Sequence, residues 1–157
     1  MKLLYAVKKA ANLRRRIYII GNGGSYANSV HLANDLLSCG IRAFAMDAAT
    51  LSAFANDFGY ETVFSRWIRI VGEVGDLLIA LSGSGNSPNI IRALVEARLI
   101  GMATFSITGS FANPEAIGYS DNSIVEGHDM QAAENYQLII GHEVMLQLKK
   151  ERQCASR

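Results

Sequence analysis

The stretch IYIIGNGGSYANSVHLANDLL, residues 17–37, decides the fold of this chain. It opens with an apolar, β-rich run, passes through three glycines and a serine, and continues with apolar residues at helical spacing. This order predicts a strand over residues 16–20, a turn, and a helix that stops at Gly40. A strand that enters a helix through glycines leaves backbone N–H groups at the positive end of the helix dipole, which is a ready anion site.

The rest of the chain continues the alternation of strands and helices. Further strands are predicted at residues 42–46, 76–81, 102–108 and 122–127, with helices at 88–99 and 130–150 and two helical pieces, broken near Gly59, within 47–75. The run DLLIAL (76–81) shows no polar alternation, which is typical of a strand buried on both faces. The sequence therefore predicts an α/β fold, a three-layer α-β-α sandwich around a parallel sheet of about five strands. With 157 residues, half of them hydrophobic, we expect a single domain over 1–157.

Composition argues against several classes of function. The net charge is +1 and the charges alternate in sign, so no basic stripe favours nucleic acid as a partner. Apolar runs such as residues 77–81 are too short to span a membrane, and the first residues do not have the pattern of a signal peptide. Cys39 and Cys154 form no CxxC motif, which is typical of reduced thiols in a cytoplasmic protein.

A second glycine- and serine-rich turn, SGSGNS (82–87), follows the predicted strand 76–81. Ser82, Ser84 and Ser87 offer hydroxyl donors, and Gly83 and Gly85 allow a ligand to approach the backbone closely. Ligands of parallel α/β sheets bind beyond the carboxyl ends of the strands, so both turns are candidates for one anion site. The alternative is that these glycines only make tight turns and the serines only cap helices.

A dinucleotide site is the main competitor for the first turn. Gly21 and Gly23 fit the first two positions of Gly-x-Gly-x-x-Gly, and Asp47 follows the next predicted strand as a ribose-binding acid would. Tyr26 occupies the third glycine position, where its side chain would obstruct close packing of helix and strand. This reading also leaves SGSGNS without a role, and neither turn carries the lysine of a Walker-type nucleotide loop.

Histidines and carboxylates recur at helical spacing on two predicted helices. His31 and Asp35 are four residues apart and share a face. Glu134 and His142 are eight apart, about 80° around a helix axis, so they too can face one direction. If these faces meet, the group suits proton transfer or a divalent metal such as zinc. The alternative is that they are ordinary solvated or partly buried side chains.

Four segments of the chain together resemble the sugar isomerase (SIS) domain family, and within it the phosphoheptose isomerases. They are GNGGSYANSVHLANDL (21–36), AFANDFGYETVFSRWI (53–68), GDLLIALSGSGNSPNIIRAL (75–94) and GMATFSITG (101–109). The resemblance implies the SIS fold and an enzyme that converts sedoheptulose 7-phosphate, a ketose, into the aldose D-glycero-D-manno-heptose 7-phosphate. It also implies a homotetramer, or a homodimer, with sites at subunit interfaces.

The resemblance also implies roles for individual residues. Asp35 and His142 take the catalytic positions, as base and acid. The ligands of a zinc ion are His31, Asp35, Glu134 and His142. The substrate-binding positions, with the phosphate on the serines, are Asn22, Gly23, Ser25, Asp57, Ser82, Gly83, Ser84, Asn86, Ser87 and Glu134.

Two positions depart from the family pattern. Asp35 stands where the family has a glutamate, which draws the carboxylate back by about 1.5 Å, a scale on which catalytic geometry is sensitive. Glu134 stands where the family has a glutamine and adds a negative charge, and a further sugar-contacting aspartate falls at Gln131 or Asp129. These departures motivate a second hypothesis, a non-catalytic phosphosugar-binding SIS protein that acts as a regulator or interaction module.

The segment before the first predicted strand also differs from the family, which has a longer helical segment there. Two explanations stay open at this point. Either the start of the sequence is truncated, or the oligomer forms with a shorter N-terminal segment.

Overall fold

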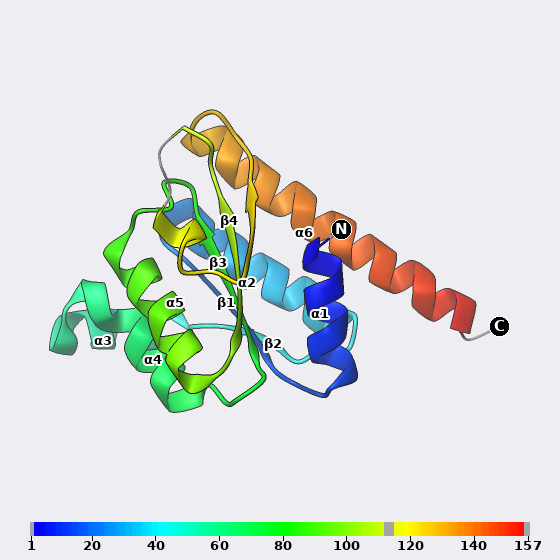
Figure 1. Cartoon of the computed structure of the whole chain (residues 1–157), viewed down its shortest axis with the longest axis horizontal. Coiled ribbons are helices and arrows are strands. Elements are labelled where there is room, and N and C mark those ends of the chain that lie inside the picture. Colours follow the sequence, from blue (N-terminus) through cyan, green and yellow to red (C-terminus); the bar gives the residue numbers. More distant parts are fainter. Residues whose placement is uncertain (1, 112–114, 156–157) are drawn as a thin grey trace.

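The alternation of strands and helices expected from the sequence is present in the computed structural model, which describes residues 2–111 and 115–155. The strands are β1 (Ile17–Gly21), β2 (Ala43–Ala45), β3 (Leu77–Ser82), β4 (Ala103–Thr108) and β5 (Asn122–Val125). They pair in parallel, in the order β2-β1-β3-β4-β5 (Figure 1). The predicted parallel α/β sheet is confirmed.

Helices cover both faces of this sheet (Figure 1). One layer holds α1 (Lys2–Asn12), α2 (Gly23–Ser38) and the long α6 (Met130–Ala155). The other holds α4 (Val63–Val71) and α5 (Pro88–Ile100), with α3 (Ala48–Phe58) projecting from it. The 3-10 turns η1 (Tyr60–Thr62) and η2 (Glu115–Ile117) complete the described elements. Gly59, at φ +86°, ends α3 where the sequence predicts the break.

The core is divided by the sheet into two layers. Ile17 and Ile19 of β1 face the layer of α1, α2 and α6, whereas Tyr18 and Ile20 face α4 and α5. Every residue of β1 and β3 is buried, as their lack of alternation predicts. Cys39 is a buried free thiol within the first layer, and the side chain of Cys154 lies outside the described residues.

The order of the strands places the two glycine turns side by side. β1 pairs with β2 on one side and with β3 on the other, and Gly21 stands opposite Leu81 in the register. The chain therefore leaves β1 and β3 in opposite directions across the sheet, and ligands of open α/β sheets bind at such a switch point. The turns 21–25 and 82–87 lie at this carboxyl edge.

No helix within the described ranges combines the length and the apolar character that crossing a membrane requires.

Candidate functional site

The passage from β1 into α2 needs glycine at positions 21 and 23. A Cβ on Gly21 would collide with the backbone of Ser25, and Gly23 has a φ of +54°, which side chains rarely adopt. No atom lies within 4 Å of the position a Gly23 Cβ would take. Tyr26 N donates to Asn22 O (3.2 Å), so the N–H groups of the three preceding residues stand outside the helical pattern at the positive end of α2. The turn is therefore suited to an anion.

The serines of the second turn accept hydrogen bonds from their own backbone. Ser82 Oγ accepts from Gly85 N (3.1 Å), and Ser84 Oγ accepts from Asn86 N (3.3 Å). A hydroxyl that accepts keeps its single proton for another acceptor, so both can still donate to a ligand. Ser87 stands at the N-cap of α5, and its side chain makes no capping bond to the described residues of that helix.

An amide pair holds the two turns together. Asn22 Nδ2 donates to Asn89 Oδ1 (2.9 Å), and Asn89 Nδ2 donates back to Asn22 Oδ1 (2.8 Å). Tyr60 adds a bond from its hydroxyl to Asn22 Oδ1 (2.8 Å). The predicted sugar-contacting residue Asn22 therefore also links the β1 and β3 turns. Sequence reasoning missed Asn89, although an asparagine on the buried side of an apolar helix was an available signal.

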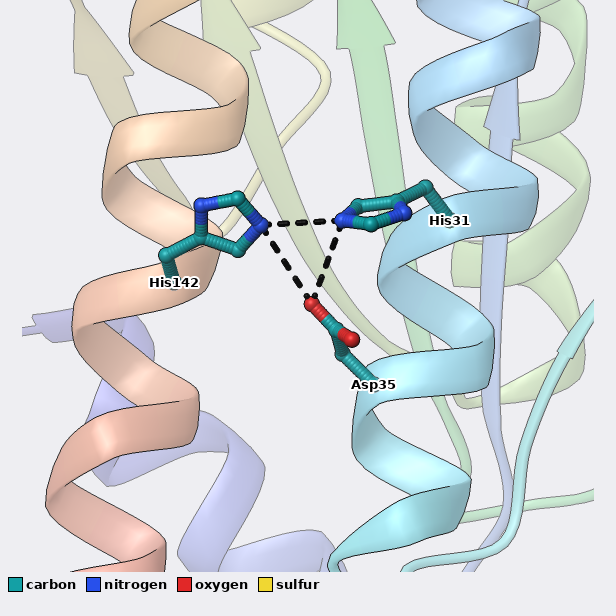
Figure 2. A group of neighbouring side chains, drawn as sticks. All are labelled: His31, Asp35 and His142. Atoms are coloured by element: carbon teal, nitrogen blue, oxygen red, sulfur yellow. Dashed lines mark hydrogen bonds and ion pairs between the residues drawn. The ribbon is translucent and has the colours of Figure 1, made fainter.

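Two histidines and an aspartate meet where α2 lies beside α6 (Figure 2). His31 Nε2 lies 2.9 Å from His142 Nε2, and Asp35 Oδ2 lies 3.4 Å and 3.5 Å from these two nitrogens. The Asp35 side chain is 19% exposed, and its Oδ2 is buried without a hydrogen-bond partner among the described residues.

These three atoms suit a divalent cation. Two ligands of a tetrahedral zinc ion at bond lengths of about 2.0–2.1 Å stand about 3.3 Å apart. The two edges to Asp35 are 3.4 Å and 3.5 Å, and the edge between the histidines is shorter, 2.9 Å. The donor set, two imidazoles and a carboxylate, is one that zinc accepts, and a cation would satisfy the orphaned oxygen of Asp35. The group could therefore hold a metal.

Three of the four predicted metal ligands meet in this group, and the carboxylate of Glu134 is not among the atoms that lie within 4.8 Å of one another. Glu134 lies eight residues before His142 on α6, about 12 Å along the axis. Its carboxylate lies instead against Gly24, where an added Cβ would collide with it. The residue thus stands at the first turn of α2, among the candidates for substrate binding.

Asp57 lies apart from the two turns, and Ser25 is the buried member of the first turn. Asp57 is exposed near the end of α3, where its carboxylate accepts from Asn56 Nδ2 (2.9 Å). Ser25 is only 3% exposed and accepts a bond from the buried Gln137. Sequence reasoning missed Gln137, which lies three residues after Glu134 on the side of α6 that packs against α2.

Asp47, the candidate ribose-binding residue of a dinucleotide site, makes hydrogen bonds within α3. Asp47 is the N-cap of α3 and accepts from Thr50 Oγ1 (2.6 Å) and Thr50 N (2.9 Å). These hydrogen bonds, first that of the Thr50 hydroxyl, lower the pKa of Asp47. Capping therefore explains the acidic residue after β2 without a ribose.

A match of sequence, together with the fold and this site, assigns the chain to a family. The family model of the SIS domain matches residues 2–109, and the chain belongs to the SIS domain family. It is similar to phosphoheptose isomerases of known sequence. That of Akkermansia muciniphila is 46% identical over 109 residues, 64% of this chain and 56% of that protein. That of Maridesulfovibrio salexigens is 36% identical over 155 residues, 90% of this chain and 75% of that protein.

Solved structures give the same relationship. The structure of phosphoheptose isomerase from Neisseria gonorrhoeae matches with a TM-score of 0.87 at 26% identity, over 95% of this chain and 84% of that one. Over its matched residues the chain spans little more than half of the Akkermansia protein, 56% of its length.

Proposed function

We propose that this chain, as one SIS domain, is a sugar-phosphate isomerase that converts sedoheptulose 7-phosphate into D-glycero-D-manno-heptose 7-phosphate through an enediol. The observation that carries the proposal is the convergence of His31, Asp35 and His142 on α2 and α6. His31 lies eight residues beyond Gly23, about 12 Å along the helix that starts at the anion-binding turn. One extended sugar phosphate can therefore lie between the turn and the group. The names of the similar proteins support the same reaction.

The reaction needs one base and one acid beside the carbonyl of the sugar. Asp35 takes the proton from C1 of the ketose, and His142 protonates the oxygen on C2, which gives the enediol. Return of a proton to C2 and loss of the proton on O1 give the aldose, so no net atom is gained or lost. Asp35 Oδ2 and His142 Nε2 are 3.5 Å apart, so the carboxylate and the imidazole can serve neighbouring atoms of one substrate when Nε2 carries the proton and is not bound to the metal.

His31, Asp35 and His142 would hold the zinc ion. A bound zinc ion would polarise the oxygens of the reacting centre. Asp35 has two carboxylate oxygens, and only Oδ2 faces both histidines. The second oxygen leaves the residue able to act as a base. The pair of turns binds the phosphate through backbone N–H groups and the hydroxyls of Ser82, Ser84 and Ser87.

The assembly proposed is a homotetramer, or a homodimer, with sites completed between subunits. Large apolar side chains are exposed on the two helices that carry the histidines, Ile139 (49%) and Leu146 (52%) on α6 and Val30 (45%) and Leu37 (49%) on α2. Within each helix the two are seven residues apart and share a face. α3, which carries Asp57, buries none of its residues. The cytoplasmic location expected from the cysteines stays a prediction.

The proposal is tested by following the aldose formed from sedoheptulose 7-phosphate with zinc supplied. We expect Ser84→Ala to raise KM about tenfold through a lost bond to the phosphate, with kcat nearly unchanged. His142→Ala should lower kcat by about a hundredfold or more, because it removes the acid. Ser65→Ala, on α4 of the other layer, is the matched control. A chain that binds the sugar phosphate without turning it over would contradict the proposal and favour a binding module.

A further inference from the structure

A buried hydrogen-bond network of two amides and a serine connects α6 to the first turn of α2. Gln137 is 0% exposed, Ser25 3% and Asn28 8%. Gln137 Nε2 lies 3.0 Å from Ser25 Oγ, and Gln137 Oε1 lies 2.9 Å from Asn28 Nδ2. Asn28 Nδ2 also lies 3.0 Å from the backbone oxygen of Glu134. The roles proposed above for the base, the acid and the metal ligands use neither amide.

The direction of each hydrogen bond in this buried network follows from the one group whose role is fixed, the backbone oxygen of Glu134. The backbone oxygen of Glu134 can only accept, so Asn28 must turn its NH2 group toward it. The second hydrogen of that NH2 group then points to Gln137, which must present its oxygen. The NH2 group of Gln137 is therefore left to donate to Ser25 Oγ. Ser25 is an acceptor in this bond, and its own proton is available for a different partner.

Ser29, one turn further along α2, shows the usual alternative. Its hydroxyl donates back to the carbonyl oxygen of Tyr26 at 2.7 Å, as serines inside helices commonly do. Ser25, in the first turn of α2, receives a bond from Gln137 instead. The difference between the two serines lies in the buried amide on α6.

We propose that Gln137 is a positioning residue, which directs the hydroxyl proton of Ser25 to the phosphate of the substrate. The proposal rests on the proposed function in that it takes the anion at the α2 turn to be a sugar phosphate. Gln137 acts through Ser25 and does not touch the ligand. The arrangement adds a neutral donor to the backbone N–H groups at the positive end of α2.

Gln137→Glu reverses the direction of this bond while keeping the shape of the side chain. An ionised carboxylate still accepts from Asn28 but cannot donate, so Ser25 turns its proton toward residue 137 and away from the ligand. We expect the Kd for sedoheptulose 7-phosphate and for inorganic phosphate to rise about tenfold, and KM to rise with kcat nearly unchanged. Burial raises the pKa of a carboxyl group, so the effect should grow between about pH 6 and pH 9 as this one ionises.

A double-mutant cycle with Ser25→Ala separates positioning from loss of structure. If Gln137 acts through Ser25, Gln137→Glu has no further effect on Kd once Ser25 is alanine. Gln137→Met, which removes both bonds but leaves the Ser25 hydroxyl able to rotate, should raise Kd less than Gln137→Glu does. Thr104→Val is the matched control, since it removes the two hydrogen bonds that the buried Thr104 hydroxyl makes with Asp121, at the opposite end of β4. It should lower stability without changing Kd.

The outcomes separate this proposal from the isomerase proposal. An equal Kd for the wild type and Gln137→Glu at high pH, or the same rise in Kd in the Ser25→Ala background, overturns the role of Gln137 and leaves the isomerase intact. Binding of the sugar phosphate without turnover overturns the isomerase, and the Kd values still decide the role of Gln137. Absence of phosphate binding by the wild type overturns both.

Discussion

Asp35 is the residue on which the chemistry depends. It is one methylene shorter than the glutamate that the family resemblance implies, yet its Oδ2 lies within 3.5 Å of both histidine nitrogens. Because Oδ2 is buried without a partner, the ionised side chain is costly unless a cation or a protonated imidazole compensates it. The aspartate therefore completes the group without a longer side chain.

Asp35→Asn should weaken zinc binding by at least about tenfold, because it removes the only negative ligand of the described group. A competition titration against a fluorescent zinc chelator measures the change. Glu143→Gln, next to His142 on the exposed side of α6, is the control and should leave zinc affinity unchanged. Equal zinc affinity in Asp35→Asn and the wild type would show that the metal is held elsewhere or not at all.

Sequence reasoning located His31 and Asp35 on one face because helical spacing is a local property. It could not establish that this face meets His142, which is 111 residues from His31 and is placed by the packing of α6 on α2. The carboxylate of Glu134 lies against Gly24 and not beside the two histidines, and its role as a metal ligand stays a prediction. Asn89 and Gln137 were missed because their partners lie in other elements.

At the scale of elements, the Asn22–Asn89 amide pair sets how the turn after β1 lies against the turn after β3. Asn89 is 2% exposed, and its Oδ1 also accepts from Ile90 N (3.0 Å). The bonds thus connect the start of α5 to the anion-binding turn of α2.

Asn89→Ala should lower the free energy of unfolding by about 1–3 kcal/mol, since it leaves buried polar groups without partners. Phosphate should also bind more weakly, because the two turns lose their link. Chemical denaturation and phosphate titration measure the two effects. Asn56→Ala, on the exposed surface of α3, is the control. A destabilised Asn89→Ala with unchanged phosphate affinity would show that the turns bind anions independently.

The pair Arg69–Glu96 joins α4 to α5 and makes stability depend on pH. Two bonds from Arg69 to Glu96, 2.6 and 2.8 Å long, lower the pKa of the Glu96 carboxyl. Since the pKa is lowered by folding, the pair stabilises the protein above the ordinary pKa of glutamate, about 4.3, and this stability is lost as the pH falls through the lower, folded value.

Thermal melts of the wild type and Glu96→Gln between about pH 3 and pH 7 test this dependence. We expect the wild type to be the more stable at neutral pH and the difference to shrink as the solution becomes acidic. Glu61→Gln, a substitution at an exposed residue of η1, is the control. A difference that stays constant across the range would rule out a contribution from this ion pair.

At the scale of the whole molecule, the alternation of strands and helices was predictable from the first strand onward, whereas α1 was not among the predicted elements. Apolar runs such as IYII and LLIAL carry the strands because both faces of a parallel sheet are covered. The boundaries of the elements were less predictable. For example, α2 begins at Gly23, inside the glycine turn, because Asn22 takes the N-cap position. The order of the strands, which brings the two turns together, depends on pairings between distant segments.

The apolar side chains beside the histidine pair predict an assembly. Ile139→Ser combined with Leu146→Ser should lower the mass measured by light scattering, because both remove apolar surface from one face of α6. Leu99→Ser, on α5 in the other layer and 77% exposed, should not change the mass. A wild-type chain that is monomeric under the same conditions would contradict the proposed oligomer.

The central claim, that Asp35 and His142 exchange protons with a ketose phosphate, is tested most directly in D2O. Sedoheptulose 7-phosphate is incubated with the protein and zinc, and the products are followed by NMR. We expect the aldose to form with deuterium at C2, and Asp35→Asn to abolish both conversion and exchange. Recovery of the ketose unchanged, without deuterium at C1, would contradict the account.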